Sequence, residues 1–136
     1  FKKITMNNKL DKILAEISAG ELIDKITILE IKKENIKDIK KLDDVEKELL
    51  SLNNTLKVSI PNQSKINVLI KKLKHINLRL WDIENGKRLA EKNNKFDEKF
   101  IKLARSVYKE NDERSRIKLE INNILNSNIK EIKSHY

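Results

Sequence analysis

The sequence predicts an all-α protein, an antiparallel helical hairpin bundle of three to four helices. Gly occurs twice, Pro once and aromatic residues make up 4% of the 136 residues. Leu, Ile, Lys and Glu dominate instead, which is typical of long packed helices. Apolar residues also recur at helical spacing through most of the chain. The length suits one core, so we expect a single helical domain over residues 1–136, with short extended segments at either terminus.

The first helix is predicted at about residues 19–41. Ser18 and Glu21 have the spacing of a capping box, in which the serine oxygen accepts a helix N–H and the glutamate reaches back. Apolar residues occupy two sides of this helix, so more than one of its faces should be covered. We therefore expect a homodimer that buries one of these sides, formed by Ile28, Ile31 and Ile39.

A second helix is predicted at about residues 43–57. Without a break, the first helix would run to Lys57 and measure roughly 58 Å, at a rise of 1.5 Å per residue. The apolar pattern shifts near residue 40, and Asp43 with Glu46 can cap a new helix. A break or kink is therefore expected near Leu42, followed by the apolar positions Val45, Leu49, Leu52 and Leu56.

The third helix is predicted at about residues 65–92, after the clearest loop in the chain. Pro61 is followed by Asn62, Gln63 and Ser64, which is turn chemistry that ends in a helix N-cap. The apolar residues then alternate at spacings of three and four, a pattern typical of coiled-coil pairing. They are Ile66, Leu69, Leu73, Ile76, Leu80 and Ile83.

The last helix is predicted at about residues 98–126. Asp97 is its N-cap, and Phe96 with Ile101 has the spacing of a hydrophobic staple. Few residues separate it from the third helix, so the two should form an antiparallel hairpin that turns about Asn94. Its core face is expected at Phe100, Ala104, Val107, Ile121 and Leu125, and the tail from residue 126 should be irregular or weakly extended.

Composition argues against several kinds of site and location. The chain has no Cys and its two His are 60 residues apart, so we expect no metal centre. Glycine-rich phosphate loops are excluded by the glycine count, and no cofactor is expected. Charges interrupt every apolar run before the roughly 20 residues that a membrane helix needs, and no signal peptide is evident. A cytoplasmic protein without membrane contact follows as the expectation.

Three carboxylates, Glu30, Glu34 and Asp38, are spaced four residues apart on the first predicted helix. Such a row is able to hold Mg²⁺. Lys33 and Lys37 alternate with them, however. An exposed ladder of opposite charges is the favoured interpretation.

A net charge of +9 raises the question of nucleic-acid binding. Residues 65–80 contribute five positive charges and no acid. Arg, which recognises phosphates and bases better than Lys, supplies only five of the 30 cationic residues. No aromatic residue interleaves this basic stretch to stack on bases. Specific nucleic-acid binding is therefore not expected.

A polar layer is predicted inside the hairpin. Asn111 and Arg114 fall at the centre of the apolar face of the last helix, where Leu or Ile would continue an ordinary core. Buried polar groups need partners. Facing them on the third helix is a stripe formed by Asn77, Trp81, Glu84 and Arg88.

Folding the hairpin brings Trp81 level with Tyr108 and Glu84 level with Arg105. Asp24 and Lys25 on the first helix are able to close the cluster from a third side. Two interpretations remain open for it. The first is a buried, mutually paired network that fixes register and partner choice. The second is an anion-binding pocket. In this pocket, Glu84 would act as an acid or base and Trp81 would form an apolar wall. The anion would be held by Arg88, Arg105 and Arg114.

Three blocks of sequence carry a resemblance to a known family. They are ISAGELIDKITILEIK at residues 17–32, LWDIE at residues 80–84 and FIKLARSVYKENDER at residues 100–114. Together they resemble a small uncharacterised domain family of bacteria and their phages. The resemblance implies no activity, substrate or partner. Members sometimes lie near surface-polysaccharide genes, which implies a link to that biosynthetic pathway.

Residues 21–32 also resemble the opening helix of a chorismate-mutase-type bundle, where an Ile-Asp-x-Ile pattern lies beside substrate-binding cations. That chemistry needs several cations around a dicarboxylate. Lys25 is the only well-placed cation in this block, and every Arg lies beyond residue 78. We therefore expect a non-enzymatic interaction or assembly module. A small all-helical enzyme or binding protein for an anionic small molecule is the alternative.

Overall fold

The computed structural model describes residues 9–134, and these form four α-helices and no strand. The helices are α1 (Ala19–Asn35), α2 (Ile39–Ser59), α3 (Asn67–Lys92) and α4 (Glu98–Ile124). The prediction of an all-α helical bundle is confirmed. None of the four helices is long and apolar enough to cross a membrane.

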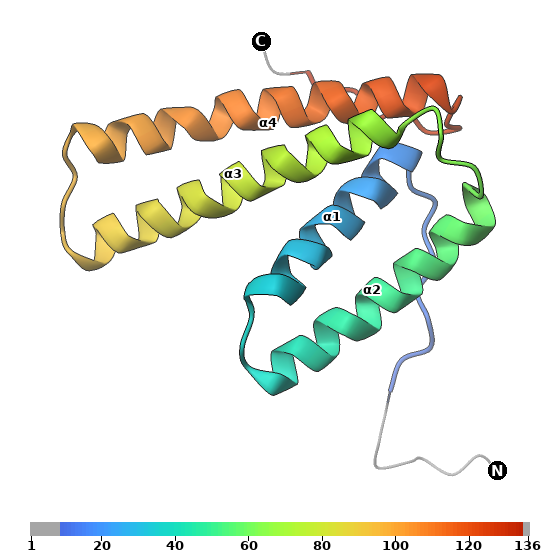
Figure 1. Ribbon diagram of the computed structural model, residues 1–136, viewed down its shortest axis with the longest axis horizontal. Coiled ribbons are helices and arrows are strands. Elements are labelled where there is room, and N and C mark those ends of the chain that lie inside the picture. Colours follow the sequence, from blue (N-terminus) through green and yellow to red (C-terminus); the bar gives the residue numbers. More distant parts are fainter. Residues whose placement is uncertain (1–8, 135–136) are drawn as a thin grey trace.

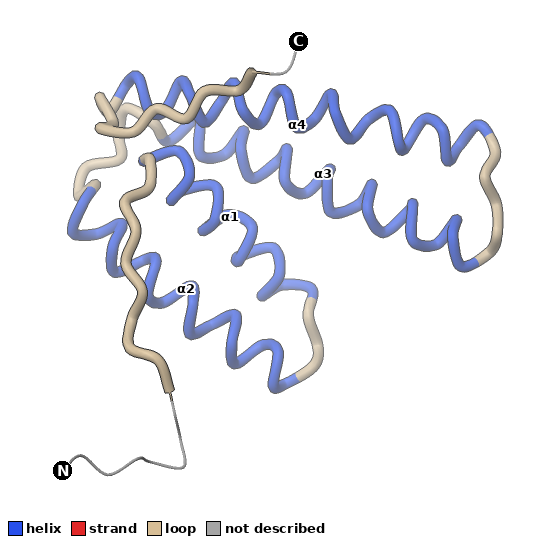
Figure 2. The backbone as a smooth tube through the Cα atoms, turned by 180° about the vertical axis from the view of Figure 1, so that it is seen from behind, coloured by secondary structure: helices blue, strands red, loops and turns tan. Residues whose placement is uncertain are grey.

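The helices are arranged as two antiparallel hairpins, α1 with α2 and α3 with α4 (Figure 1). Helix α1 is central, because it packs against each of the other three helices. Its first turns lie against both α3 and α4, and it then diverges from α4 toward α2 (Figures 1 and 2). This crossing leaves part of the α3–α4 hairpin without a third helix.

The break between α1 and α2 lies at residues 36–38 rather than near Leu42. Ile36 is extended, with φ −81° and ψ 130°, and ends α1. The carboxylate of Asp38 accepts the backbone N–H groups of Lys40 and Lys41 and so begins α2. Asp38 therefore has the capping role that the sequence suggested for Asp43, because a side-chain oxygen that satisfies free N–H groups starts a helix wherever it occurs first.

The start of α3 also differs from the prediction. Ser64 is not its N-cap: the Ser64 N–H donates to Asn62 Oδ1 at 3.0 Å, in a turn that precedes the helix. The N-cap position is Ile66, which caps nothing through its side chain and is fully buried. Burial of an apolar side chain thus sets this helix start, in place of polar capping. At α4 the cap follows the prediction, because Asp97 Oδ1 accepts the Phe100 N–H at 3.2 Å.

The core is aliphatic and lies where α1 meets the other three helices. It is formed by Leu22, Ile23, Ile26, Leu29, Val45, Leu49, Ile60, Ile66, Leu69, Leu73, Ile76, Ile117 and Ile121. Two sequence expectations about burial are wrong. On the expected core face of α4, Ile121 is in the core and Leu125 packs against it, but Ala104 is exposed, and the half-buried Phe100 and Val107 do not belong to the core either. Ile31 is 1% exposed within the chain itself and is therefore not free to form a dimer surface, while Ile28 is half-buried and Ile39 is 82% exposed.

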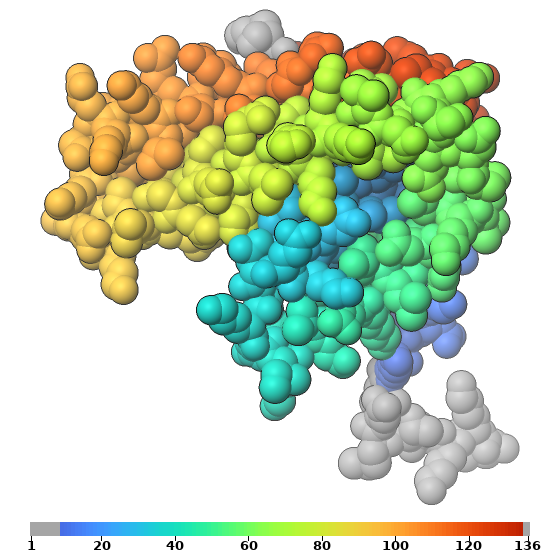
Figure 3. Space-filling view, viewed as in Figure 1, coloured from blue at the N-terminus to red at the C-terminus, as the bar shows by residue number. Residues whose placement is uncertain are grey.

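The far half of the α3–α4 hairpin projects beyond α1 and α2, as the yellow and orange end of the molecule shows (Figure 3). No residue from 78 to 116 is fully buried. The hairpin turns at Asn94, which has the left-handed φ of 53° that Asn tolerates better than most residues. This half of the hairpin thus has no core of its own.

Candidate functional site

The polar centre of the structure is an ion pair between α1 and α4. Asp24 is completely buried, and Arg114 reaches it with two guanidinium nitrogens. Arg114 Nε lies 2.9 Å from Oδ1 and 3.1 Å from Oδ2, and Nη2 also donates to Oδ2. This two-nitrogen geometry matches the planar fork of Arg to a carboxylate. The hydrogen bonds to Asp24 raise the pKa of Arg114 against the opposing effect of burial, so this guanidinium stays charged.

Asn77 on α3 ties the third helix into the same pair. Its Nδ2 donates to Asp24 Oδ1 at 2.8 Å and to Thr27 Oγ1 at 2.9 Å. The Thr27 hydroxyl in turn donates to the backbone oxygen of Asp24. A carboxylate only accepts hydrogen bonds, so these contacts fix which way the Asn77 amide points. Three helices therefore meet on one buried carboxylate.

Lys118 adds a second cation beside this pair. Its Nζ lies 3.1 Å from Glu21, 3.7 Å from Glu131 and 3.9 Å from Asp24. Three carboxylates thus surround two cations, Arg114 and Lys118, in a half-buried setting. A buried carboxylate without such partners is strongly destabilising. The cluster locks α1 against α4 and against the C-terminal segment.

The N-terminus of α1 is held by polar groups from α4 and the segment after it. The Ala19, Gly20 and Glu21 N–H groups donate to Ser127 Oγ at 3.1 Å, Asn122 Oδ1 at 2.6 Å and Ser18 Oγ at 3.0 Å, respectively. Free N–H groups at a helix start are what would attract an anion. Because side chains accept hydrogen bonds from these three N–H groups, the start of α1 is fixed against α4 and the segment after it, and it offers no anion site.

The Ser18–Glu21 box therefore forms only in part. Ser18 caps Glu21 as predicted, but the Glu21 side chain turns to Lys118 instead of reaching back. The Ser18 hydroxyl donates to Glu131 Oε1 at 2.6 Å. A carboxylate partner is able to activate a serine nucleophile, but Ser18 is 1% exposed. Its role is structural.

A cleft of about 360 Å³ opens beside the ion pair, between α1 and the α3–α4 hairpin. Its apolar walls come from α1 and α3, and its polar groups come from α3 and α4. The lining residues are Ile28, Ile31, Asn77, Leu80, Trp81, Glu84, Asn85, Arg88 and Arg114. This is the place where a small molecule has access to the network.

The chain matches DUF6165, described as a family of unknown function, over residues 13–136. The chain belongs to this family. No curated protein and no solved structure matches this chain. In this DUF6165 chain, the matched region contains all four helices and every residue of the network and the cleft.

The structure brings some of the predicted site residues of this DUF6165 chain together. Asp24 and Arg114 are paired, and Arg114 Nη1 lies 3.4 Å from Asn111 Oδ1. Trp81, Glu84 and Arg88 line the cleft next to Arg114. Glu84 pairs with Lys87 at 3.1 Å, on its own helix, and makes no bond to Arg105.

Three predicted residues lie apart from this group. Lys25, Arg105 and Tyr108 are exposed, and none of the three forms an ion pair or side-chain hydrogen bond with another described residue. Lys25 follows Asp24 directly, and successive residues of a helix point about 100° apart. Because Asp24 faces the interior, Lys25 faces solvent.

Sequence reasoning assigned no role to Lys118 and Asn122, which complete the network. A signal for both was present, since Arg114, Lys118 and Asn122 are each four residues apart and so share one face of α4. Asn122 is completely buried and bonds the first turn of α1. Continuing the row from Arg114 would have revealed this docking face.

The carboxylate row on α1 does not form a shared site. Glu30 and Glu34 approach Lys74 of α3 at 3.6 and 3.3 Å, whereas Asp38 caps α2. Within residues 9–134, no group of three or more His, Asp or Glu side chains is close enough to hold a metal ion. His135 lies outside the described residues.

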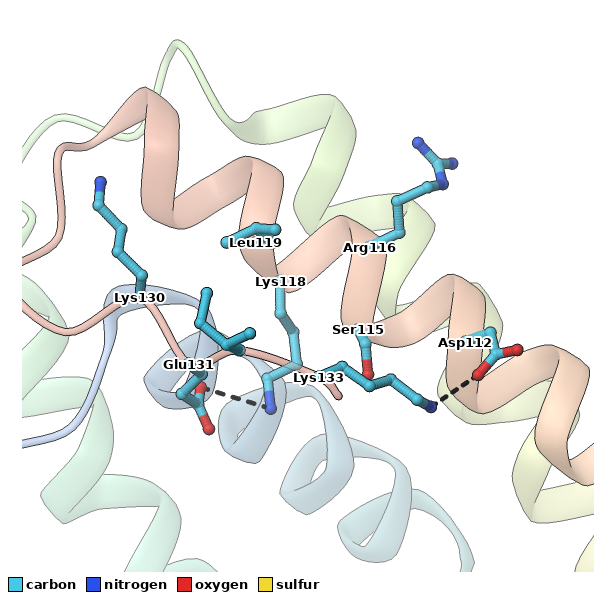
Figure 4. A pocket seen from close by; sticks show the side chains of 9 residues that line it. Asp112, Ser115, Arg116, Lys118, Leu119, Lys130, Glu131 and Lys133 are labelled. Atoms are coloured by element: carbon cyan, nitrogen blue, oxygen red, sulfur yellow. Dashed lines mark ion pairs between the residues drawn. The ribbon is translucent and has the colours of Figure 1, made fainter. Parts of the chain in front are cut away.

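A second pocket, of about 350 Å³, lies between α4 and the C-terminal segment (Figure 4). Four cations line it, but each already has a partner. The pairs are Lys118 with Glu131, Lys133 with Asp112, Arg116 with Glu113, and Lys130 with the main-chain oxygen of Asn122. Hydrogen bonding to Arg116 lowers the pKa of Glu113, so that pair stays ionised at neutral pH. Three of these four contacts, all except the Arg116–Glu113 pair within α4, fasten the C-terminal segment to α4.

The projecting half of the α3–α4 hairpin carries an unusual share of aromatic surface. Three of the four aromatic residues in the described part of the chain, Phe96, Phe100 and Tyr108, lie there, and the fourth, Trp81, lines the cleft beside α1. The Phe96 ring meets the Phe100 ring edge to face, with centroids 5.2 Å apart. We call Phe96, Phe100, Ile101, Ala104 and Tyr108 the hairpin patch.

Proposed function

We propose that this protein is a non-enzymatic assembly module that forms a homodimer through the projecting half of the α3–α4 hairpin. The observation that carries the proposal is that aliphatic and aromatic side chains lie in different parts of the molecule. The buried core is entirely aliphatic, whereas three of the four described aromatic residues lie in the half of the hairpin that has no core. Aromatic residues are the side chains most enriched at protein interfaces.

The hairpin patch follows one side of α4. Ile101, Ala104 and Tyr108 are spaced by three and four residues, so they form a stripe, and Ile101 and Tyr108 are 52% and 55% exposed. Phe96, at the tip, is 50% exposed. Two helices alone bury little apolar surface, and a bundle normally needs further helices to cover such a stripe.

A second copy of the chain is the occupant that the charges favour. Arg105 and Asp82 lie in the same half of the hairpin, and neither of them forms an ion pair with another described residue. A twofold dimer places the same surface against itself, so a surface with both signs of unpaired charge is self-complementary. Two antiparallel hairpins also complete a four-helix arrangement.

The test is the molar mass by light scattering after size exclusion, at tens of micromolar protein. We expect a dimer for the natural chain and a monomer for Tyr108→Glu and Ile101→Glu, because a charge in a buried apolar interface lacks a partner. The control is Ile39→Glu, at an exposed apolar position on α2, which should stay dimeric.

Each other outcome contradicts part of the proposal. A monomeric natural chain refutes self-association. If Ile39→Glu dissociates the dimer and Tyr108→Glu leaves it intact, the interface lies on the α1–α2 side instead. Circular dichroism of each variant distinguishes dissociation from unfolding.

The family resemblance adds a cellular setting to the proposal. We place the module in the cytoplasm of bacteria or phage-infected bacteria and link it to surface-polysaccharide biosynthesis. The support is the resemblance carried by residues 17–32, 80–84 and 100–114. Cell fractionation tests the location, and staining of surface polysaccharide after deletion of the gene tests the pathway. An unchanged surface in the deletion strain removes the link.

A further inference from the structure

We propose that the cleft between α1 and the α3–α4 hairpin binds a small hydroxylated organic anion with a single negative group. This proposal is independent of the dimer. The cleft is large enough for such a molecule, at about 360 Å³. Residues of three helices line it. One of them, Arg114, is held in place by its ion pair with Asp24.

The first argument is an unused acceptor on Asn77. This residue lines the cleft and is 5% exposed. Its Nδ2 is fixed toward Asp24 and Thr27, so the other amide atom, Oδ1, is free to accept. No described residue donates to Oδ1. Among the described residues, only Glu110 Oε2 is buried without a hydrogen-bond partner, so Asn77 Oδ1 is open to the solvent of the cleft, where a ligand hydroxyl is able to donate to it.

The second argument is the cationic side of the cleft. Asp24 uses the Nε and Nη2 of Arg114, while Nη1 has only a long contact of 3.4 Å to Asn111. Arg114 therefore keeps N–H donors that Asp24 does not use. Arg88 lies in the same cleft and forms no ion pair with another described residue. Together the two guanidinium groups are suited to a carboxylate or a phosphate.

The third argument limits the charge and shape of the ligand. The side chains that line the cleft include two cations, Arg88 and Arg114, and one acid, Glu84. Asp24 balances the charge of Arg114, and Glu84 pairs with Lys87. Arg88 is therefore the one cation of the cleft without an ion-pair partner among the described residues. A single available cation favours a ligand with one anionic group over a polyphosphate. Glu84 is able to accept hydrogen bonds from further hydroxyl groups, and Trp81 and Ile28, which also line the cleft, offer apolar surface to the ring of a sugar acid or sugar phosphate.

Trp81 also provides the measurement, because it is the only Trp in the chain. The protein is titrated with glucuronate, glucose 6-phosphate, glucose and inorganic phosphate, and Trp fluorescence and the melting temperature are recorded. We expect a saturable fluorescence change and a higher melting temperature with one of the two hydroxylated anions. Which of them binds tells whether the anionic group is a carboxylate or a phosphate.

Two variants sharpen the experiment. Arg88→Gln removes an exposed cation from the cleft and should weaken binding about tenfold or more, as expected for a charge-assisted contact. Lys92→Gln, which removes an exposed cation outside the cleft, should bind like the natural chain. The proposal is overturned if neither hydroxylated anion gives a saturable change, if glucose or inorganic phosphate alone binds equally well, or if the two variants bind alike. Light scattering of the same samples reports the dimer separately.

Discussion

At the residue scale, the sequence predicted a buried polar group on the last helix but not all of its partners. Asn111 and Arg114 interrupt an apolar face, and the structure pairs Arg114 with Asp24. Periodicity identifies which residues face inward along one helix. It does not give the register between helices, and for that reason Lys118, which lies 3.9 Å from Asp24, received no role from the sequence alone.

Replacing Arg114 tests whether this network supports the fold. Arg114→Met leaves the completely buried Asp24 without its main partner. We expect the free energy of unfolding to fall by about 3–5 kcal/mol, the usual cost of breaking a buried pair. Arg105→Met, at an exposed position without an ion pair, should change it by less than about 0.5 kcal/mol. Urea denaturation measures both, and equal stabilities would show that the network contributes nothing.

Substitution of the two glycines, Gly20 on α1 and Gly86 on α3, tests how closely α1 packs against α4. A Cβ added at Gly20 would lie 2.5 Å from the backbone oxygen of Lys118 and 3.0 Å from Asn122 Oδ1. Backbone cannot move aside without separating α1 from α4, so Gly20→Ala should destabilise the protein by about 1–3 kcal/mol.

At Gly86 the added Cβ would meet the end of a flexible side chain, Leu103 Cδ1, at 2.9 Å. Alanine gains up to about 1 kcal/mol in helix propensity, which offsets the adjustment of Leu103. Gly86→Ala should therefore remain within about 1 kcal/mol of the natural chain. Thermal unfolding of both variants gives the comparison, and a larger loss for Gly86→Ala than for Gly20→Ala contradicts the close docking of α1.

At the element scale, local signals predicted where most helices lie, and competition between similar signals explains the errors. Ser18 and Asp97 each cap the helix that the sequence assigned to them. Between α1 and α2, two aspartates of similar capping ability lie five residues apart, and only tertiary packing decides between them. Ile36 is half-buried against the core, so the chain turns immediately after it and Asp38 becomes the cap.

The choice between the two aspartates is measurable. Asp38→Ala removes the oxygen that accepts the Lys40 and Lys41 N–H groups, and should cost about 1 kcal/mol of stability. Asp43→Ala, inside α2 and exposed, should be neutral or slightly stabilising because alanine favours helices. Chemical denaturation of both variants tests this, and the reverse ranking would place the helix start at Asp43 after all.

At the scale of the whole molecule, the arrangement of the helices follows from features that are far apart in the sequence. Helix α1 enters the α3–α4 groove where Gly20 permits close approach to α4, and Asp24 then binds both α3 and α4. The divergence of α1 from α4 leaves the end of the hairpin uncovered (Figures 1 and 3). The cleft lies between α1 and the hairpin. No local pattern encodes a crossing angle, so the sequence predicted the hairpin but not its projection.

The charge of the whole molecule supports one last prediction, on nucleic acid. Two of the five cations in residues 65–80 are already paired across helices, Lys74 with Glu30 and Glu34, and Arg79 with Glu110 at 3.0 Å. The free phosphate-binding charge is therefore smaller than the net charge of +9 suggests. We expect weak, sequence-independent binding to duplex DNA at low salt, which is lost near physiological salt because few counterions are released. Fluorescence anisotropy with two unrelated duplexes at rising salt measures this.

Glu110→Gln releases Arg79 and should strengthen binding at low salt without creating a preference between the duplexes. Tight binding to one duplex at physiological salt would instead show a specific reader, which the scarcity of Arg and of aromatic residues on this stretch argues against.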